Sequence, residues 1–307
     1  MKTYDLIIIG GGPAGISAAL YAARQKLKFI LISKDIGGLA NYIPELKTYL
    51  GINYIAGYEL VKKFQEHIDK NKIPRKEENV KSVSQTKSGL KVTTENSSYN
   101  TKSIIIASGR KFKKLGIKGE NKYENKGLSF CAACDGPLFR NKEIAIVGGG
   151  RSGLYSALFM LSVAKKIYLI EKAGEIKETG GLSHIAKLVK ESKKVKILTD
   201  TEPKEIIGNK FVTGLKVETK CREKLIKVNG IFVEIGYEPN TDFIKDLVEL
   251  NNRREVIINK NNMSDVPGIF AAGDVTDVPE KQVVVAVGEG AKAALSAIFY
   301  LENVSKK

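Results

Sequence analysis

The stretch IIIGGGPAG at residues 7–15 decides the fold, because its glycines join a buried strand directly to a helix. The apolar run at 4–9 predicts a strand, residues 14–25 predict a helix, and residues 29–33 predict the return strand. Together these segments form one β-α-β unit. A G-x-G-x-x-G turn between a strand and a helix is typical of folds that bind dinucleotides. The alternative is a tight strand-to-helix turn without a ligand.

Each glycine of this turn has a distinct predicted task. Gly10 permits the tight turn, Gly12 lets the backbone approach a pyrophosphate, and Gly15 allows the helix to pack closely. The N-terminus of the helix then faces the phosphates, where its free N–H groups favour negative charge.

The same pattern returns at residues 148–153, which read GGGRSG. A predicted strand at 143–147 precedes it, and a predicted helix at 152–164 and a strand at 167–171 follow it. The two units start well over a hundred residues apart, so the pattern indicates a duplicated architecture rather than a short repeat. The residues that we expect at a nicotinamide nucleotide are Gly148, Gly150, Arg151, Ser152, Gly153 and Glu171.

Glu171 ends the second strand of this unit, where an acidic residue normally accepts the ribose 2′-hydroxyl hydrogen bond. A carboxylate there would repel the 2′-phosphate of NADPH, so the sequence favours NADH. Lys172 and Lys177 could weaken that repulsion. Arg151 has two open interpretations, a contact to phosphate or an exposed position at the start of a helix.

Between the two glycine loops lies CAACD, residues 131–135. A C-x-x-C pair can cycle between disulfide and dithiol, and the motif lowers the pKa of the attacking thiol. Two nucleotide-binding loops with one such pair predict a flavoenzyme that passes electrons to a dithiol. One cysteine would attack the substrate disulfide and the other would face the flavin. Asp135 could carry the proton that the departing thiolate needs, or cap a helix, and the two roles are compatible.

Metal binding is not expected. The chain has only two histidines, His67 and His184, and no second C-x-x-C to complete four ligands. The third cysteine, Cys221, stands in a charged run and is expected at the surface or in a hairpin.

The formal net charge of +16 over 307 residues has two possible meanings. Nucleic-acid binding is not expected, because no nucleic-acid module is present and the basic residues are spread along the chain. A role in steering an acidic partner protein towards the dithiol fits better. No stretch approaches about 18 uncharged apolar residues, and a strand begins almost at the N-terminus, so neither a membrane span nor a signal peptide is expected. The expected location is the cytoplasm.

The remaining pattern predicts an α/β fold with two Rossmann-like, three-layer ββα domains, the second inserted into the first. We expect a strand hairpin at 80–94, strands at 103–107, 230–235 and 269–274, and a closing helix at 286–300. No low-complexity linker is present, so the chain should cross between domains near 110–114 and 239–242. The expected domains are 1–112 with 243–307, and 113–242.

In these motifs the chain resembles a known family, the low-molecular-weight thioredoxin reductases, which are class II pyridine nucleotide-disulfide oxidoreductases. It is also similar to the reductase half of the alkyl hydroperoxide reductase flavoprotein. The resemblance runs in order through IIIGGGPAG, IGGLANY, IIIASGRKFKKLGIKGE, CAACDGPLF, IAIVGGGRSG and GIFAAGDV. The stretch VPEKQVVVAVGEGAKAAL is more similar to the peroxide-reductase branch, but that branch carries an additional N-terminal thioredoxin-like module. A stand-alone thioredoxin reductase is therefore the expected match.

The resemblance implies FAD in the outer domain, the C-x-x-C in the inserted domain, a homodimer, and a rotation between domains. It also implies that Cys134 faces the flavin, that Cys131 attacks the substrate, and that Asp135 donates the proton. The positions that the resemblance assigns to FAD are Gly10, Gly12, Pro13, Ala14, Gly15, Gly37, Gly38, Leu39, Thr48, Ala107, Gly109, Gly273, Asp274, Lys281, Gln282 and Val283.

The chain departs from the family pattern at several of these sites. Leu39 replaces a frequent Gln, and Thr48 replaces the flavin-contacting Asn, although the backbone contacts to FAD would remain. The His-Arg-Arg stretch of NADPH-using members is Glu171-Lys172-Ala173 here, and Tyr155 replaces an acidic residue. The electron donor could therefore be NADH, NADPH, ferredoxin or a deazaflavin.

The sequence is compatible with three functions. The leading one is a flavin-dependent disulfide reductase that passes electrons through FAD and Cys131–Cys134 to thioredoxin or a glutaredoxin-like protein. The second is a flavin-dependent dithiol oxidase, which would run the pair backwards and give electrons to oxygen. The third is a flavin-binding scaffold or redox sensor without a donor site, and the intact Cys131, Cys134 and Asp135 argue against it.

Overall fold

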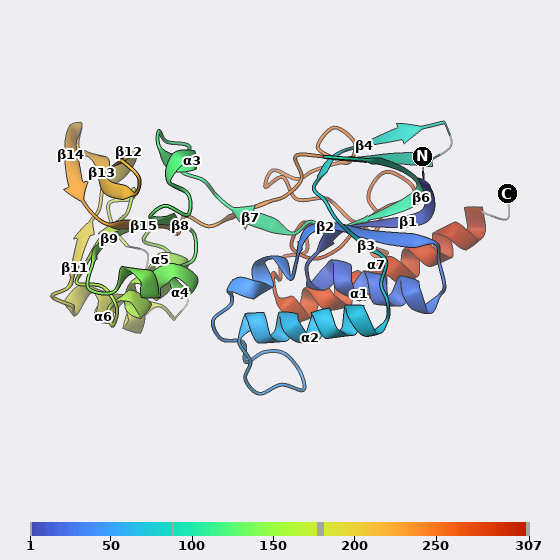
Figure 1. Cartoon of the computed structure of the whole chain (residues 1–307), viewed down its shortest axis with the longest axis horizontal. Coiled ribbons are helices and arrows are strands. Elements are labelled where there is room, and N and C mark those ends of the chain that lie inside the picture. The colour runs from blue at the N-terminus through green and yellow to red at the C-terminus, as the bar shows by residue number, and fades with distance from the viewer. Residues whose placement is uncertain (1, 88, 177–180, 305–307) are drawn as a thin grey trace. The chain divides into compact units, whose positions relative to one another are not determined.

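The computed structural model describes residues 2–87, 89–176 and 181–304 (Figure 1). The chain divides into two compact units. Unit 1 comprises Met1–Lys111 and Glu238–Lys307, and unit 2 comprises Phe112–Tyr237. Unit 2 is thus a single insertion in the sequence of unit 1, and each unit is described by itself.

The sheet of unit 1 is built around the strand that IIIGGGPAG predicts. Its strands are β1 (Lys2–Gly11), β2 (Phe29–Ile36), β3 (Arg75–Glu77), β4 (Val80–Thr86), β5 (Gly89–Thr94), β6 (Ser98–Ile106) and β17 (Ile269–Ala271). The order is β3-β2-β1-β6-β5-β4, and β1 pairs in parallel with both β2 and β6. The first half of β6 pairs with β5 and its second half with β17, so β6 joins an antiparallel meander to the parallel core.

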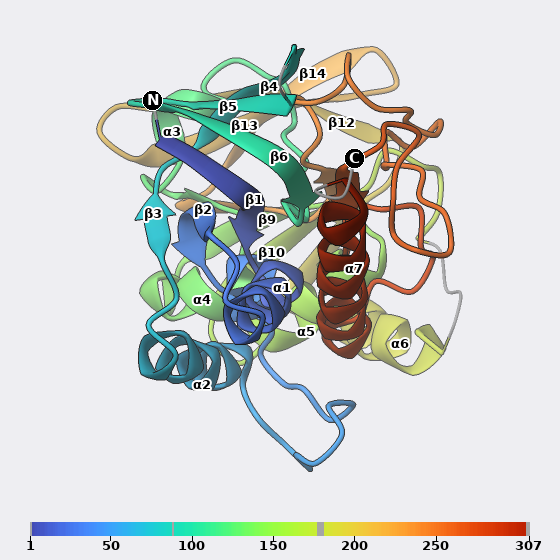
Figure 2. The same ribbon diagram turned by 90° about the vertical axis from the view of Figure 1, so that its right-hand side faces the viewer.

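Helices cover one face of this sheet (Figure 2). They are α1 (Pro13–Arg24), η1 (Gly38–Tyr42), α2 (Gly57–Lys70) and α7 (Val283–Val304). Because side chains alternate along a strand, Leu6 and Ile8 of β1 face the core shared with α1 and α7. Ile7 and Ile9 face the opposite core, which the meander and the segment before β17 complete. The apolar run of β1 is therefore buried on both faces, as a central parallel strand requires.

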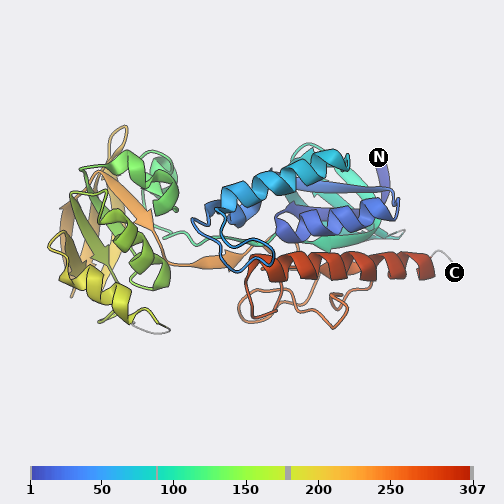
Figure 3. The same cartoon turned by 90° about the horizontal axis from the view of Figure 1, so that it is seen from below.

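Helix α7 bears on the expectation that the chain has no membrane span. It is long and apolar enough to cross a membrane by length and composition, with a mean hydropathy of 1.5. The helix itself was expected at 286–300, and Glu289 and Lys292 interrupt its apolar run. One third of this stretch is buried inside the protein, and Ala293, Ala294 and Ala297 pack in the core with α1. Figure 3 shows α7 beside α1 along most of its length.

Unit 2 repeats this architecture. Its five-stranded sheet is parallel in the order β11-β10-β9-β15-β8, and the antiparallel strands β12, β13 and β14 pack on one face. Helices α5 and α6 pack on the other face. The strands are β8 (Leu128–Ser129), β9 (Glu143–Val147), β10 (Lys166–Ile170), β11 (Val195–Leu198), β12 (Thr201–Gly208), β13 (Val212–Thr219), β14 (Arg222–Lys227) and β15 (Gly230–Val233). The helices are α3 (Glu120–Tyr123), α4 (Ala132–Asp135), η2 (Gly136–Phe139), α5 (Arg151–Met160) and α6 (Ser183–Glu191).

The duplicated α/β architecture with two Rossmann-like units is confirmed. The segments through which the chain passes between the units form the short strands β7 (Arg110–Phe112) and β16 (Tyr237–Pro239), which pair with each other. They lie close to the crossings expected from the sequence. The pattern did not predict α2, α6 or the β12–β14 meander.

The first testable prediction concerns the contact between α1 and α7. A Cβ on Gly290 would lie 2.0 Å from the Ala14 carbonyl oxygen, whereas a Cβ on Gly288, in the same helix, would meet nothing within 4 Å. Alanine favours a helix over glycine by about 1 kcal/mol, so we expect Gly288→Ala to raise the free energy of unfolding by up to that amount. Gly290→Ala should lower it by about 1–3 kcal/mol, because the helices must separate. Urea unfolding of both variants is the measurement, and an equal gain in both would contradict the close approach.

Candidate functional site

The first glycine loop is packed tightly on one side and open on the other. A Cβ on Gly10, whose φ is +115°, would lie 2.2 Å from the Ala107 carbonyl oxygen. A Cβ on Gly15 would lie 1.8 Å from the Gly10 carbonyl oxygen. A Cβ on Gly12 would meet nothing within 4 Å, and Gly12 caps α1 without any side-chain hydrogen bond. The loop therefore leaves the first N–H groups of α1 facing open space, as a bound pyrophosphate would require.

The turn before η1 completes this open cradle. The Gly37 N–H donates to the Gly11 carbonyl oxygen at 2.7 Å, and the nearest atom to a Cβ on Gly38 would be the Gly12 Cα at 3.8 Å. Ser33 also holds the loop, because its Oγ accepts the Gly11 N–H at 2.7 Å. Ser33 stands near the end of the second strand, where an acidic residue usually binds ribose.

Other expected FAD positions lie around the same loop. A Cβ on Gly273, whose φ is +79°, would lie 3.0 Å from the Ala14 Cβ. Burial raises the pKa of the neighbouring Asp274 carboxyl group. Gly109 accepts the Asn240 N–H at 2.9 Å at the point where the chain leaves β6. Pro13 is the first residue of α1. Leu39 is half-buried in η1, and Thr48 is exposed in the loop that follows.

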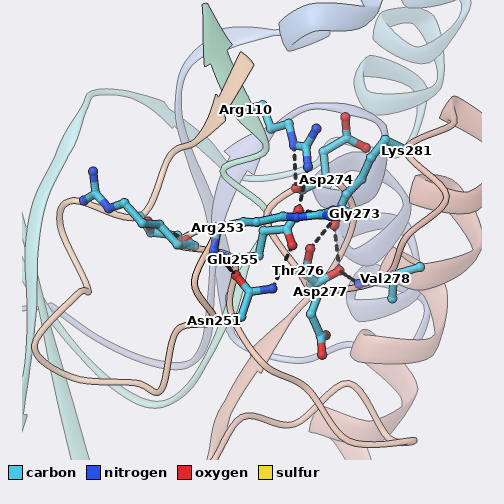
Figure 4. Close-up of polar contacts among 12 residues, drawn as sticks. Arg110, Asn251, Arg253, Glu255, Gly273, Asp274, Thr276, Asp277, Val278 and Lys281 are labelled. Atoms are coloured by element: carbon cyan, nitrogen blue, oxygen red, sulfur yellow. Dashed lines mark hydrogen bonds and ion pairs between the residues drawn. The ribbon is translucent and has the colours of Figure 1, made fainter. Parts of the chain in front are cut away.

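Lys281 lies in an ion-pair group around a buried carboxylate, which we call the Glu255 cluster and define as Arg110, Glu255 and Lys281 (Figure 4). Glu255 is 3% exposed, and its Oε1 lies 2.5 Å from Arg110 Nη2 and 3.2 Å from Lys281 Nζ. Burial opposes ionisation of Glu255, but hydrogen bonds from Asn251 and Lys281 outweigh it and hold the pKa of Glu255 below its usual value. Burial lowers the pKa of Lys281 despite this pairing.

Two side chains of the Glu255 cluster donate hydrogen bonds to backbone carbonyl groups at or near the expected FAD positions. Lys281 Nζ donates to the Thr276 carbonyl oxygen at 2.5 Å, and Arg110 Nε donates to the Asp274 carbonyl oxygen at 3.3 Å. Gln282 follows directly, and its carbonyl oxygen accepts the Ala286 N–H of α7 at 2.9 Å. Val283 packs against the small core under the loop before α2. The ammonium group of Lys281 is therefore already engaged by protein groups.

The second glycine loop has the same geometry. A Cβ on Gly148, whose φ is +112°, would lie 2.4 Å from the Glu234 carbonyl oxygen, and one on Gly153 would lie 1.7 Å from the Gly148 carbonyl oxygen. A Cβ on Gly150 would meet nothing within 4 Å. Arg151 is the exposed first residue of α5, and Ser152 follows it half-buried.

Glu171 lies at this loop, as its place in the sequence predicts. Its Oε2 accepts the Gly149 N–H at 2.6 Å, and its Oε1 accepts the Ala173 N–H at 2.8 Å. The ammonium group of Lys172 pairs with Glu202 at 2.9 Å instead. Lys177 lies outside the residues that the structure describes. The two backbone hydrogen bonds keep the Glu171 carboxylate at the mouth of the loop.

The C-x-x-C pair lies on unit 2. Cys131 and Cys134 form a disulfide with their Cα atoms 5.4 Å apart. Cys131 is buried, with 9% of its surface exposed, whereas Cys134 is exposed. The Cys134 N–H donates to Cys131 Sγ at 3.1 Å. An amide that points at a sulfur stabilises negative charge there, so Cys131 is the better site for a thiolate after the disulfide opens.

Asp135 is linked to Cys131 through one hydroxyl group. Ser129 Oγ donates to Asp135 Oδ2 at 2.6 Å and accepts the Cys131 N–H at 3.0 Å. The Asp135 side chain makes no capping hydrogen bond to the η2 turn that follows it. The alternative role as a helix cap is therefore wrong, and the carboxylate faces the dithiol turn instead.

The sequence analysis missed Glu234, which directly follows β15. Its Oε1 accepts the Ser156 hydroxyl hydrogen bond at 2.6 Å. Burial nevertheless raises the pKa of Glu234 above its usual value. The carbonyl group of Glu234 faces Gly148 as that of Ala107 faces Gly10, a contact between distant segments that no local pattern predicts.

Cys221 lies at the exposed turn between β13 and β14, with a φ of +61°, so its expected position in a surface hairpin is confirmed. In the described ranges 2–87, 89–176 and 181–304, no three His, Cys, Asp or Glu side chains gather as metal ligands.

Two β-α-β folds with glycine loops at helix N-termini, and a redox C-x-x-C on the second, define a dinucleotide-binding oxidoreductase. A family model described as pyridine nucleotide-disulphide oxidoreductase matches residues 4–290, and the chain belongs to this family. The chain is 40% identical over 304 residues to a component of the alkyl hydroperoxide reductase of Staphylococcus aureus strain MRSA252, covering 98% of this chain and 59% of that protein. It thus spans less than two thirds of this relative's length.

Among the solved structures that match over nearly the whole chain are two thioredoxin reductases. Thioredoxin reductase of Lactococcus lactis superposes with a TM-score of 0.84 at 32% identity, covering 98% of this chain and 99% of that one. A ferredoxin-flavin thioredoxin reductase of Clostridium acetobutylicum matches with a TM-score of 0.58 at 30% identity, covering all of both chains.

A pH-dependent stability effect follows from the position of Glu234. Because the pKa of Glu234 is higher in the folded than in the unfolded protein, its ionisation opposes folding. The contribution of Glu234 to the stability of the wild type therefore falls as the pH rises from about 4.5 through the folded pKa. Glu234→Gln lacks this loss, so the variant should gain stability relative to wild type at pH 8 but not at pH 4. The gain is about 1.4 kcal/mol for each unit of pKa difference. Thermal unfolding at both pH values measures it, and a pH-independent difference would contradict the argument.

Proposed function

We propose that this protein is a flavin-dependent disulfide reductase. Electrons would pass through FAD on unit 1 to Cys131–Cys134 on unit 2, and then to a disulfide in thioredoxin or a glutaredoxin-like protein. The observation that carries the proposal is the Cys131–Cys134 disulfide in unit 2, together with an open glycine loop in each unit. The disulfide supplies the redox couple, and the cradles supply two sites for nucleotide cofactors.

The residues of unit 1 fit FAD. Gly38 lies beside Gly12, and Gly12 faces open space at the uncapped N-terminus of α1, where the pyrophosphate would lie. FAD would supply the two electrons that the disulfide needs. The residues proposed to hold it are Gly10, Gly12, Pro13, Ala14, Gly15, Gly37, Gly38, Leu39, Thr48, Ala107, Gly109, Gly273, Asp274, Lys281, Gln282 and Val283.

The amide that faces Cys131 Sγ supports a specific order of bond changes. The electron pair enters at Cys134, the exposed sulfur, and the S–S bond breaks. Cys131 leaves with the bonding pair as a thiolate that accepts the Cys134 N–H, and one proton neutralises the Cys134 sulfur. We propose that Asp135, whose carboxylate accepts the Ser129 hydroxyl hydrogen bond, transfers that proton. The Cys131 thiolate then attacks the partner's disulfide, and Cys134 resolves the mixed disulfide.

This order predicts the behaviour of the single cysteine variants. Cys134→Ser should keep FAD bound but lose disulfide reduction, because the electron pair has no sulfur to enter. It should also trap, as a mixed disulfide through Cys131, a partner that lacks its resolving cysteine and whose remaining cysteine carries a thionitrobenzoate group, which leaves as the new disulfide forms. Cys131→Ser should form no such adduct under the same conditions. Non-reducing mass spectrometry distinguishes the two, and reduction by Cys134→Ser at the wild-type rate would show the relay to be wrong.

The proposed nicotinamide donor is NADH. The Glu171 carboxylate stays at the mouth of the second loop, where a 2′-phosphate would meet its charge. Reduced ferredoxin is a second candidate donor, because the Clostridium ferredoxin-flavin thioredoxin reductase matches this chain over its full length.

The experiment is anaerobic bleaching of the flavin band, with NADH, NADPH and reduced ferredoxin added separately. Faster bleaching by NADH than by NADPH is expected, and Glu171→Gln should narrow that ratio. Bleaching by ferredoxin alone would assign the donor to the second candidate. Reduction by dithionite but by none of the three donors would contradict both.

A matched pair of glycine variants distinguishes the cofactors that bind at the two glycine loops. Gly12 and Gly150 both have open space where a Cβ would stand, so alanine at either position should leave the fold intact. Gly12→Ala is expected to lower the FAD content of the purified protein severalfold, because its Cβ enters the pyrophosphate cradle. Gly150→Ala should retain FAD and lose reduction by NADH. Equal FAD content in both variants would argue against FAD on unit 1.

The partner is proposed to be an acidic redox protein. Unit 2, which carries the dithiol, contains 24 Lys and Arg against 14 Asp and Glu, so it holds most of the net charge of +16. Such a surface accelerates encounters with an acidic protein at low ionic strength.

We also propose a homodimer in the cytoplasm. A dithiol oxidase would differ by forming peroxide from oxygen and a dithiol substrate.

A further inference from the structure

Two expected FAD positions, Gly273 and Asp274, lie in a turn of unit 1 that ends at Thr276. The Gly273 carbonyl oxygen accepts the Thr276 N–H at 3.0 Å and the Thr276 hydroxyl hydrogen bond at 2.8 Å, so the turn is closed by its own groups. A Cβ on Gly273 would lie 3.0 Å from the Cβ of Ala14, in the first turn of α1. The turn therefore lies beside the first glycine loop and contributes to the shape of the proposed FAD site.

The Glu255 cluster fixes two further carbonyl groups of this turn (Figure 4). Arg110 Nε donates to the Asp274 carbonyl oxygen at 3.3 Å. Lys281 Nζ donates to the Thr276 carbonyl oxygen at 2.5 Å. Both cations also pair with one atom, Glu255 Oε1, at 2.5 Å for Arg110 and 3.2 Å for Lys281. A single buried carboxylate therefore sets the position of both donors.

Glu255 is itself held firmly by its surroundings. Only 3% of its surface is exposed, and its Oε2 accepts the Asn251 Nδ2 hydrogen bond at 2.8 Å. The Glu255 N–H donates to Asn251 Oδ1 at 3.0 Å. The N–H of the next residue, Val256, donates to the Val275 carbonyl oxygen at 2.9 Å, in the middle of the turn. Backbone and side chain of this segment thus both hold the turn.

The Asp274 side chain has a different environment. Among the residues that the structure describes, none forms a hydrogen bond or an ion pair with its carboxylate. The charges of Arg110 and Lys281 nevertheless act on this carboxylate, so both cations lie near it. Two carboxylates therefore compete for the same two cations, and both contacts are made by Glu255. Asp274 is left available to a ligand.

We propose that Glu255 is a positioning residue for FAD. It holds Arg110 and Lys281 against the carbonyl groups of the turn and away from the Asp274 carboxylate, which stays available to hydrogen-bond donors of the cofactor. Without the charge of Glu255, either cation could pair with Asp274, and the turn would lose the hydrogen bonds that fix its carbonyl groups. This inference rests on the proposed binding of FAD to unit 1.

The test is the dissociation constant of FAD, measured by flavin fluorescence as the purified full-length flavoprotein is diluted. Glu255→Gln should raise this constant severalfold. The sign is informative, because FAD is an anion and loss of a negative charge from the protein would by itself tighten its binding. Arg110→Lys keeps the charge, but its single nitrogen cannot replace both Nε and Nη2. It should also weaken FAD binding, by a smaller amount.

Glu78→Gln is the matched control. Glu78 is also a buried carboxylate of unit 1, with 6% of its surface exposed, and it contacts Thr94 Oγ1 at 2.5 Å and Lys76 Nζ at 3.5 Å. Neither partner contacts the turn at 273–276, so this variant removes a buried charge and should keep the wild-type affinity for FAD.

Hydrogen exchange of the peptide 273–278 gives a second measurement, made with FAD in excess so that all proteins are equally occupied. Exchange should be faster in Glu255→Gln and Arg110→Lys than in the wild type, and unchanged in Glu78→Gln.

The outcomes separate this inference from the proposed function. Wild-type or tighter binding of FAD by Glu255→Gln would overturn the inference and leave the proposed function unaffected, because FAD would still be bound. An equal loss of affinity in Glu78→Gln would also overturn it, because loss of any buried carboxylate would then be sufficient. Failure of the wild type to bind FAD would refute the proposed function, and this inference with it.

Discussion

Both units depend on one close approach, in which the carbonyl group at the end of a neighbouring strand meets the first glycine of the loop. The distances from the missing Cβ atoms, 2.2 Å at Gly10 and 2.4 Å at Gly148, leave no room for a side chain. This contact lets the chain turn within a few residues, so the helix starts directly above the edge of the sheet. The third glycine of each loop then faces open space, and the free amides of the helix face it as well. The close packing at the first glycine of each loop therefore leaves the third glycine and the N-terminus of the helix facing open space.

The same scaffold carries different polar groups in the two units. The group that accepts the amide of the second loop glycine is the Ser33 hydroxyl in unit 1 and the Glu171 carboxylate in unit 2. The residue that faces the first loop glycine is Ala107 in unit 1 and Glu234 in unit 2. Unit 2 therefore has two carboxylates where unit 1 has none. The backbone provides the shape for binding nucleotides, and the substitutions at these paired positions make the second loop more acidic.

Much of this could be predicted from the sequence because the deciding signals are local. The strand and helix around each glycine loop, and the hairpin at 80–94, follow from short patterns that the structure confirms. Strands β12–β14 were missed because their many charged residues lie on a half-exposed meander. Glu234 was missed because its importance comes from β15 lying beside β9, a pairing between distant segments. The Glu255 cluster joins residues more than 140 positions apart, which no local pattern reveals.

The exposed turn at Cys221 has a practical consequence. While Cys131 and Cys134 are joined as a disulfide, Cys221 is the free thiol of the chain, and it stands at the surface. A maleimide dye would attach there without any engineered cysteine. The hairpin that carries it belongs to unit 2, whereas the proposed flavin belongs to unit 1. Energy transfer between dye and flavin would therefore report the separation of the two units in single molecules, turnover by turnover.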